Sequence, residues 1–181
     1  MMSLPVLRRC VFFVPRNLRQ GLHSTRGEGQ PIGFIGLGHM GSKMVENMKR
    51  DGRHLLVYDA SPDVTKKVAC CPEIKAASSV EQIANSCEVV FSMLPNDKAV
   101  SGISEQLLNG SNNTYHISCS TISPVTSRSL AKEYEKRGKV FIASPVFARP
   151  KNEALFEPGL TFAVSKGVVA PVPENEAFAS L

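Results

Sequence analysis

"PIGFIGLGHMGSKM", residues 31–44, sets three glycines directly after a short apolar run. Gly36, Gly38 and Gly41 fit the pattern G-x-G-x-x-G. At this spacing the first glycine permits a tight turn, the second lets the main chain approach a pyrophosphate, and the third lets a helix pack close to a strand. The stretch therefore predicts a strand, a phosphate-binding turn and the beginning of a helix. The alternative is a sharp strand-to-helix turn alone, which needs only one or two glycines.

An acidic residue, Asp59, ends the next apolar run, 18 residues after Gly41. An acid at this distance accepts hydrogen bonds from an adenosine ribose, and its charge repels a 2′-phosphate. Ala60 and Ser61 follow it, and neither offers a cation to that phosphate. The pattern thus indicates a dinucleotide, with NAD favoured over NADP. The alternative use of Asp59 is to cap a turn ahead of Pro62.

From residue 31 onward, short β-branched apolar runs alternate with longer stretches of helical periodicity. This alternation is typical of βαβ units, whose right-handed crossovers build a parallel sheet. We expect an α/β fold of the Rossmann type, a doubly wound parallel sheet with helices on both faces. The expected strands are Ile32 to Ile35, Leu55 to Tyr58, a weak one near Ile74, Val89 to Met93, Tyr115 to Ser118, Val140 to Ala143 and Leu160 to Val164.

Three helices can be predicted from their ends and their apolar faces. The first has a methionine-rich face and ends at a glycine, the second begins with a capping box, and the third begins at a proline after a serine N-cap. The residues concerned are Met40, Met44, Val45, Met48 and Gly52 for the first; Ser78 with Glu81, or Ser79 with Gln82, for the second; and Ser123, Pro124, Leu130, Ala131, Tyr134 and Gly138 for the third.

The chain has 181 residues, of which 43% are hydrophobic and 20% are charged. This length and composition suit one globular domain rather than a disordered or fibrous chain. We expect a leader over residues 1–30, the domain over residues 31–165 and a loose tail over residues 166–181. No apolar run approaches the roughly 18 residues of a membrane-spanning helix, so no membrane partner is expected.

The formal net charge of +5 belongs to the leader. Five of the 21 basic residues lie in the first 27 positions, beside no acid, which leaves 16 to balance the 16 acidic residues of the remainder. An Arg-rich, acid-free segment with Leu4, Leu7, Val11 and Phe12 near helical spacing is typical of a mitochondrial transit peptide. We expect a matrix protein; a disordered arm on a cytoplasmic protein and a secretory signal are the alternatives. The neutral remainder argues against a nucleic-acid partner.

The cysteines form an odd set without the spacing of a zinc site, so we expect free thiols and no metal. They are Cys10, Cys70, Cys71, Cys87 and Cys119.

Four segments carry a family resemblance: "GFIGLGHMGSKM" (33–44), "VVFSMLP" (89–95), "SCSTISP" (118–124) and "ASPV" (143–146). In this order and spacing they resemble the β-hydroxyacid dehydrogenases, which include the 3-hydroxyisobutyrate and 6-phosphogluconate dehydrogenases. The resemblance covers about residues 31–165. It implies the dinucleotide-binding domain of a 3-hydroxyisobutyrate dehydrogenase-like oxidoreductase, which transfers hydride between NAD(P) and a small β-hydroxy acid. A non-catalytic NAD(P)-binding module is the alternative.

The resemblance also implies site residues. Ser120 and Thr121 are implied where nicotinamide and substrate meet, although a helix N-cap before Pro124 is another use of this pair. Arg149 has a planar guanidinium able to clamp a substrate carboxylate; its alternative is a solvated or structural role. Together with the glycine loop and Asp59, the expected cofactor-binding residues are Gly36, Leu37, Gly38, His39, Met40, Gly41, Asp59, Leu94, Pro95 and Thr121.

The sequence departs from the family pattern at three points. Ala99 stands where 3-hydroxyisobutyrate dehydrogenases have a cofactor-binding asparagine, and "PVFAR" (145–149) replaces the substrate-contacting P-V-S-G-G. The family's proton-accepting lysine lies on a helix of a second domain, which the chain does not reach by Leu181. We therefore assign no catalytic residue, Lys166 included, and expect this chain alone to bind cofactor without turnover.

Overall fold

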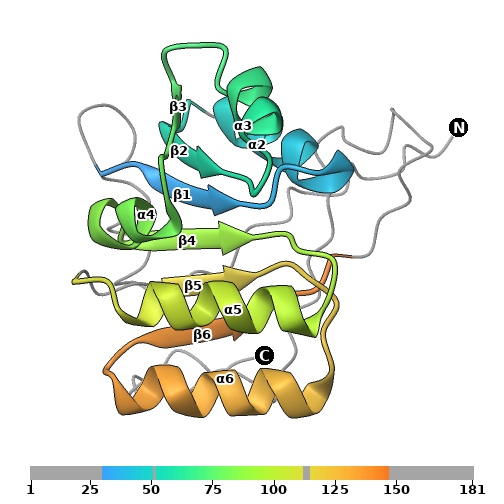
Figure 1. Cartoon of the computed structure of the whole chain (residues 1–181), viewed down its shortest axis with the longest axis vertical. Helices are drawn as coiled ribbons and strands as arrows, with labels where there is room; N and C mark the ends of the chain where they lie inside the picture. The colour runs from blue at the N-terminus through green and yellow to red at the C-terminus, as the bar shows by residue number, and fades with distance from the viewer. Residues whose placement is uncertain (1–29, 51, 112–114, 147–181) are drawn as a thin grey trace, which may run out of the picture.

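The computed structural model describes residues 30–50, 52–111 and 115–146. Strands and helices alternate along this part of the chain (Figure 1). The strands are β1 (Ile32–Ile35), β2 (Leu55–Tyr58), β3 (Ile74–Ala76), β4 (Val89–Ser92), β5 (Tyr115–Ser118) and β6 (Val140–Ala143). The helices are α2 (His39–Arg50), α3 (Pro62–Val68), α4 (Val80–Ser86), α5 (Asp97–Leu108) and α6 (Pro124–Lys136).

The six strands form one parallel sheet in the order β3-β2-β1-β4-β5-β6. At its centre, Phe34 of β1 pairs with Val57 of β2 on one side and with Phe91 of β4 on the other. The chain therefore winds outward from β1 in one direction and from β4 in the other. This order is that of the doubly wound dinucleotide-binding fold, which confirms the predicted fold class.

Six of the seven expected strands are present in the described residues. Strand β4 ends at Ser92, one residue before the predicted end at Met93, although the Met93 N–H still donates to the carbonyl of Ile35 at 2.9 Å. The seventh strand, Leu160 to Val164, lies outside the described residues, as do the leader, the predicted boundary at residue 165 and the tail.

Helices cover both faces of the sheet (Figure 1). One face packs against α2 and α3 around Phe34 and Phe91, whose buried rings stack with centroids 6.3 Å apart. The opposite face packs against α4 near β1, β2 and β4, and against α5 and α6 near β6. Figure 1 shows α5 in front of β5, with α6 beside it along the β6 edge of the sheet. Burial of apolar side chains on both faces explains why the strands are continuous hydrophobic runs.

Two glycines end helices as predicted. Gly52 follows α2 with a φ of 74°, and Gly138 follows α6 with a φ of 67°. These left-handed conformations cost glycine little, and they turn the chain back toward the last carbonyls of the helix. The Gly138 N–H, for example, donates to the carbonyl of Glu135 at 3.0 Å.

The helix beginnings follow the predicted serines. Ser123 is the N-cap of α6, and its hydroxyl accepts from the Thr126 N–H at 3.2 Å. Of the two capping boxes weighed for α4, the structure has that of Ser79, whose hydroxyl accepts from the Gln82 N–H at 3.1 Å. In a standard capping box the Gln82 side chain would accept from the N–H of the N-cap residue, Ser79. Here it accepts from the N–H of the preceding residue, Ser78, at 2.7 Å.

None of the helices in residues 30–50, 52–111 and 115–146 combines the length and hydropathy needed to cross a membrane. The four cysteines of these ranges are free: Cys70, Cys71, Cys87 and Cys119.

Candidate functional site

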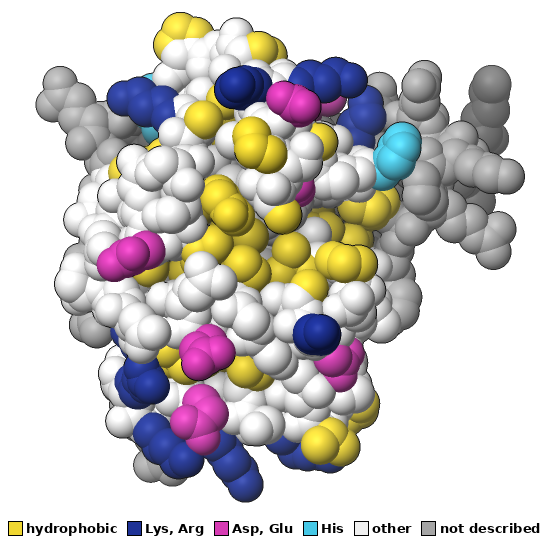
Figure 2. Space-filling view, in the orientation of Figure 1, with side chains coloured by type: hydrophobic (Ala, Val, Ile, Leu, Met, Phe, Trp, Pro, Cys, Tyr) yellow, Lys and Arg dark blue, Asp and Glu magenta, His cyan; other side chains and the backbone are white. Residues whose placement is uncertain are grey.

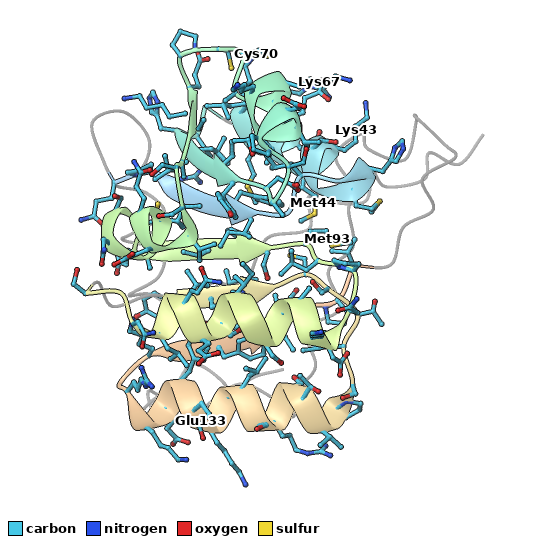
Figure 3. All side chains as sticks on the ribbon, in the orientation of Figure 1. Lys43, Met44, Lys67, Cys70, Met93 and Glu133 are labelled. Atoms are coloured by element: carbon cyan, nitrogen blue, oxygen red, sulfur yellow. The ribbon has the colours of Figure 1, made fainter. Side chains whose placement is uncertain are left out.

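The loop after β1 turns at Gly36, whose φ of 92° lies in the left-handed region. A Cβ atom at this position would collide with the main-chain carbonyl of Met93, the residue that follows β4. Figure 3 labels Met93 at this end of the sheet. The glycine thus lets the loops of the two central strands approach each other at the point where the strand order reverses. Open parallel sheets bind their ligands at such a point.

Gly41 and Gly38 lie in contrasting surroundings. A Cβ atom at Gly41 would strike the carbonyl of Gly36, so the close packing of α2 requires a glycine there. A Cβ atom at Gly38 would meet no atom within 4 Å, and the φ of this exposed residue is not positive. The fold therefore needs glycine at positions 36 and 41 but has space for a side chain at position 38. The glycine at position 38 therefore remains predicted to let a ligand approach the main chain.

The N-terminus of α2 opens onto the same space. The Gly38 carbonyl accepts from the Ser42 N–H at 2.9 Å, which makes Gly38 the N-cap residue before His39. A glycine offers no side-chain oxygen to the N–H groups of the first turn, and that turn contains no acidic residue. The helix end thus keeps its partial positive charge and its donors for an anion such as a pyrophosphate. His39 is exposed there, whereas Met40 is partly buried against the core.

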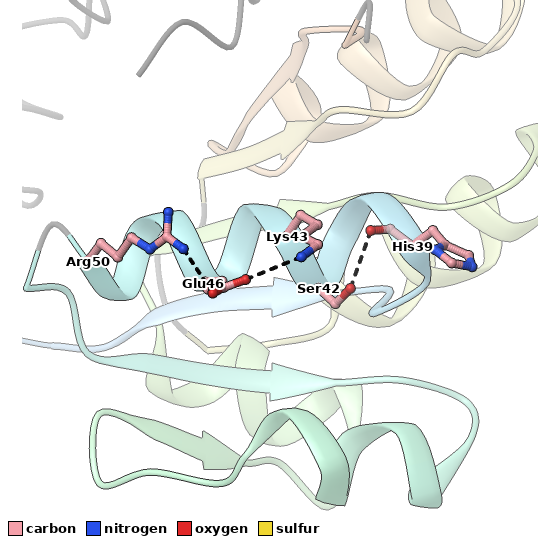
Figure 4. Close-up of polar contacts among 5 residues, drawn as sticks. All are labelled: His39, Ser42, Lys43, Glu46 and Arg50. Atoms are coloured by element: carbon pink, nitrogen blue, oxygen red, sulfur yellow. Dashed lines mark hydrogen bonds and ion pairs between the residues drawn. The ribbon is translucent and has the colours of Figure 1, made fainter. Parts of the chain in front are cut away.

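Lys43, Glu46 and Arg50 of α2 lie along its solvent face (Figure 4). Glu46 forms ion pairs with Lys43 at 3.7 Å and with Arg50 at 3.0 Å, and all three side chains are about half exposed or more. Such exposed pairs contribute little to stability. These pairs lie on the outer surface of the helix, beyond its first residues, and do not involve the N–H groups of its first turn.

Asp59 follows β2, and its carboxylate bonds to the glycine-rich loop. One oxygen accepts from the Leu37 N–H at 2.7 Å, and the other accepts from the Ser61 N–H at 2.9 Å. The buried Thr65 of α3 holds the main chain, because its hydroxyl accepts from the Asp59 N–H at 3.0 Å. Asp59 therefore caps its own turn, as one alternative expected, and lies against the loop that the glycines form; its hydrogen bonds to an adenosine ribose remain a prediction.

The loops after β4 and β5 meet through Ser120. Its hydroxyl accepts from the Leu94 N–H at 2.7 Å, and its side chain is buried. Thr121 and Pro95 are exposed beside this contact, and Leu94 is partly buried. The structure thus places Ser120 as a link between two loops. The alternative N-cap role of Ser120 and Thr121 is wrong, because the N-cap of α6 is Ser123. Arg149 lies outside the described residues, so its substrate role and that of Ser120 remain predictions.

Apolar surface lies near these loops. Figure 2 shows hydrophobic side chains gathered in the middle of the face that α4 and α5 help to form. Tyr58, Leu94 and Ile103 are partly buried and pack against the core cluster under α4. Tyr58 directly precedes Asp59, so polar and apolar groups adjoin here. A nucleoside needs both, because its base is flat and apolar on its faces while its ribose is a hydrogen-bonding group.

The structure also contains a buried polar network that sequence reasoning missed. The Nε2 atom of His116 in β5 lies 2.8 Å from the Ser92 hydroxyl, and its Nδ1 atom lies 2.8 Å from the Tyr134 hydroxyl. Burial lowers the pKa of His116 to about 3, so the imidazole is neutral at physiological pH. The network joins β4, β5 and α6 in the core and is closed to solvent, so we assign it a structural role.

Asp97, at the beginning of α5, is a second residue that the sequence did not single out. Its carboxylate accepts from the Thr126 hydroxyl of α6 at 2.6 Å. Hydrogen bonds from Thr126 and Ser123 lower the pKa of this carboxyl.

The structure shows no candidate metal site in the described ranges. No three His, Cys, Asp or Glu side chains come together there in a way that could hold a metal ion.

Comparison with known proteins agrees with this geometry. Residues 31–150 match the family model of the NAD binding domain of 6-phosphogluconate dehydrogenase. The mitochondrial 3-hydroxyisobutyrate dehydrogenase of Mus musculus is 39% identical over 123 residues, which are 64% of this chain and 36% of that enzyme. The NAD-dependent L-serine dehydrogenase of Pseudomonas aeruginosa is 32% identical over 119 residues, 64% of this chain and 40% of that enzyme.

A solved structure is similar as well. The 3-hydroxyisobutyrate dehydrogenase of Mycobacterium tuberculosis with L-serine matches with a TM-score of 0.62 and 27% sequence identity, over 67% of this chain and 42% of that one. The chain spans about 36% to 40% of the length of the two curated relatives described above. Because the family match covers residues 31–150, well over half of the chain, the protein belongs to the family of NAD-binding domains of the 6-phosphogluconate dehydrogenase type, with 3-hydroxyisobutyrate dehydrogenases among its relatives.

Proposed function

We propose that the chain binds NAD in preference to NADP at the carboxyl ends of β1, β2, β4 and β5. The observation that carries this proposal is the open space at Gly38, a glycine that the packing of the fold does not require. The pyrophosphate would lie over Gly38 and the N-terminus of α2, and the adenosine ribose would lie beside Asp59. The Asp59 carboxylate, already next to the loop through Leu37, supports selection against a 2′-phosphate.

A matched pair of alanine variants tests this site. Gly38→Ala places a methyl group where the pyrophosphate would approach, so we expect the dissociation constant of NADH to rise at least about tenfold, as the loss of one charge-assisted hydrogen bond would produce. Gly102→Ala is the control, because a Cβ atom there also meets nothing within 4 Å but projects from α5. Isothermal titration of the 181-residue chain measures both. Equal affinities in the two variants, or no binding by the unaltered chain, would refute the proposed site.

We further propose that this site serves hydride transfer between NAD and a small β-hydroxy acid. The support is the family membership and the names of the relatives, 3-hydroxyisobutyrate dehydrogenase and L-serine dehydrogenase. The bound cofactor supplies the hydride-accepting nicotinamide carbon. The residues of this chain hold its phosphates at the α2 N-terminus and orient its nicotinamide end by the loops that Ser120 joins. An NMR titration of the NAD-saturated chain with 3-hydroxyisobutyrate and L-serine tests the substrate class; no shift at millimolar acid would count against it.

We propose a mitochondrial matrix location. The arginine-rich, acid-free leader supports it, as do the mitochondrial relatives from Mus musculus and Homo sapiens. Fused to a fluorescent reporter, residues 1–30 are expected to direct import, and glutamate in place of Arg8, Arg9, Arg16 and Arg19 is expected to prevent it. A cytosolic reporter with the native leader would contradict the proposal.

A further inference from the structure

The carboxylate of Asp97 connects the loop after β4 to the beginning of α6. Both of its oxygens lie 3.2 Å from the Ser123 N–H, and one accepts from the Thr126 hydroxyl at 2.6 Å. Asp97 is the first residue of α5, whereas Ser123 and Thr126 lie 26 and 29 positions further along the chain. The contact therefore holds together two loops that are adjacent only in the folded sheet.

The direction of these hydrogen bonds follows from the chemistry of a carboxylate, which can only accept. The Thr126 hydroxyl must therefore donate to Asp97, so its oxygen is free to accept from the Ser123 hydroxyl at 2.9 Å. The Ser123 hydroxyl oxygen in turn accepts from the Thr126 N–H at 3.2 Å. Each hydroxyl donates once and accepts once, and the carboxylate is the final acceptor. Removal of that acceptor leaves the chain of bonds without a fixed direction.

Asp97 is not needed to cap its own helix. The N-cap of α5 is Asn96, whose side-chain oxygen accepts from the Ala99 N–H at 2.9 Å. The Asp97 side chain instead reaches α6. A second link lies on the other flank of the same loops, where the Leu94 N–H donates to the Ser120 hydroxyl. Thr121 lies between Ser120 and Ser123, so the segment that carries it is held at both ends.

We propose that Asp97 is a positioning residue for the nicotinamide half of the cofactor. The inference rests on the proposed NAD site. In a doubly wound sheet one half binds the adenosine end of the cofactor and the other half binds the nicotinamide end. Gly38 and Asp59 belong to the first half, after β1 and β2, whereas Leu94 and Thr121 belong to the second, after β4 and β5. Asp97 fixes the two loops of the second half against each other, because within the described residues its side-chain hydrogen bonds go to Ser123 and Thr126.

The test compares two ligands on the full 181-residue chain. NADH occupies both halves of the site, whereas ADP-ribose lacks the nicotinamide and depends on the first half. We expect Asp97→Ala to raise the dissociation constant of NADH about three- to tenfold, because the binding-competent loop arrangement becomes a minor fraction of the population. The dissociation constant of ADP-ribose is expected to stay the same, a difference that a general loss of stability would not produce.

Three further variants sharpen the comparison. Thr126→Val removes the donor without changing the charge or the shape of the side chain, and is expected to weaken NADH binding like Asp97→Ala. Asp97→Asn keeps one acceptor oxygen and is expected to recover part of the affinity. Glu105→Gln is the control for lost charge, since Glu105 is an exposed residue of the same helix.

The outcomes separate the two proposals. Equal weakening of NADH and ADP-ribose by Asp97→Ala, or no weakening of NADH, overturns the positioning role while the NAD site stands. Failure of the unaltered chain to bind either ligand overturns the NAD site and this inference together. Selective weakening of NADH by both Asp97→Ala and Thr126→Val supports it.

Discussion

The main-chain N–H of Leu37 donates to the Asp59 carboxylate across 2.7 Å, although the two residues lie 22 positions apart. The bond brings the negative charge of β2 to the loop that follows β1. Asp59 therefore holds the glycine-rich loop in place, and in the proposed NAD site its charge would also face the adenosine ribose, so it would have two physical effects on the cofactor.

Substitution of Asp59 separates these two effects. Asp59→Asn keeps an oxygen for the Leu37 N–H but removes the charge, so we expect the preference for NADH over NADPH to narrow while NADH affinity changes little. Asp59→Ala removes the acceptor too and is expected to weaken NADH binding further, by about tenfold, the equivalent of one hydrogen bond to a charged group. Titration of each variant with both cofactors measures the result. Unchanged relative affinities in both variants would show that Asp59 does not select the cofactor.

Gly41→Ala is expected to destabilise the fold. The added methyl group would meet the carbonyl of Gly36, a main-chain atom that cannot move aside as a side chain can. We expect a loss of about 1–3 kcal/mol in the free energy of unfolding, the usual cost of overpacking. Urea unfolding measures it, with Gly102→Ala as the control in open space. A Gly41→Ala variant as stable as the unaltered chain would contradict the packing described above.

His116 makes stability depend on pH. Its pKa is lowered by burial from 6.5 to about 3, so the unfolded chain binds a proton that the folded chain does not between these values. The contribution of neutral His116 to the free energy of unfolding is fully present above pH 6.5. It is lost as the pH decreases toward 3, by at most about 1.4 kcal/mol per pH unit for one proton. Urea unfolding across this range is expected to show a shallower slope in His116→Gln, whereas His54→Gln, at an exposed position, should keep the slope.

An NMR titration provides a check that does not depend on a variant. The imidazole shifts of His116 are expected to stay constant as the pH passes through 6.5. A midpoint near that value would show that the ring is accessible to protons and would contradict its burial between Ser92 and Tyr134.

Lys139 is expected to stabilise the end of α5. Its ammonium donates to the carbonyls of Leu107 and Gly110 at 3.0 and 2.9 Å, and its side chain is largely buried. Lys139→Met keeps the apolar part of the side chain but removes both bonds, so we expect a loss of about 1.5–3 kcal/mol in the free energy of unfolding. Lys136→Met is the control, because Lys136 is exposed and pairs with Glu133 on the helix surface. Equal stability of the two variants would refute this role.

Local sequence determined the six strands of the described residues, the glycine loop, both ends of α2 and α6 and the beginning of α4. The stretch at residues 31–44 contains its own turn, N-cap and packing glycine, and the short apolar runs between turn signals suit strands that are buried on both faces. The helix ends at Gly52 and Gly138 are also local, because they depend on the left-handed conformation of a single residue.

Helices α3 and α5 were not among the helices predicted from the sequence. The buried face of α5 contains Ser104 between Val100 and Leu107, so its apolar repeat is interrupted by a polar residue. Ser104 is acceptable there because its hydroxyl lies 3.4 Å from the His116 ring. His116 is in β5, 12 positions further along the chain, and no local sequence pattern predicts this contact.

Only the tertiary structure decided which distant polar groups, main-chain N–H groups included, form hydrogen bonds with each other. Leu37 with Asp59, Leu94 with Ser120, and Asp97 with Thr126 are separated by 22 to 29 positions in the chain. Each pair lies where two strands of the parallel sheet end, and the strand order that brings them together arises from the packing of whole helices on its two faces. Backbone propensity acts over a few residues, whereas these contacts depend on the register of separate strands. The sequence by itself therefore identified a dinucleotide-binding loop, and the folded sheet decided that Ser120 and Asp97 hold the loops opposite it.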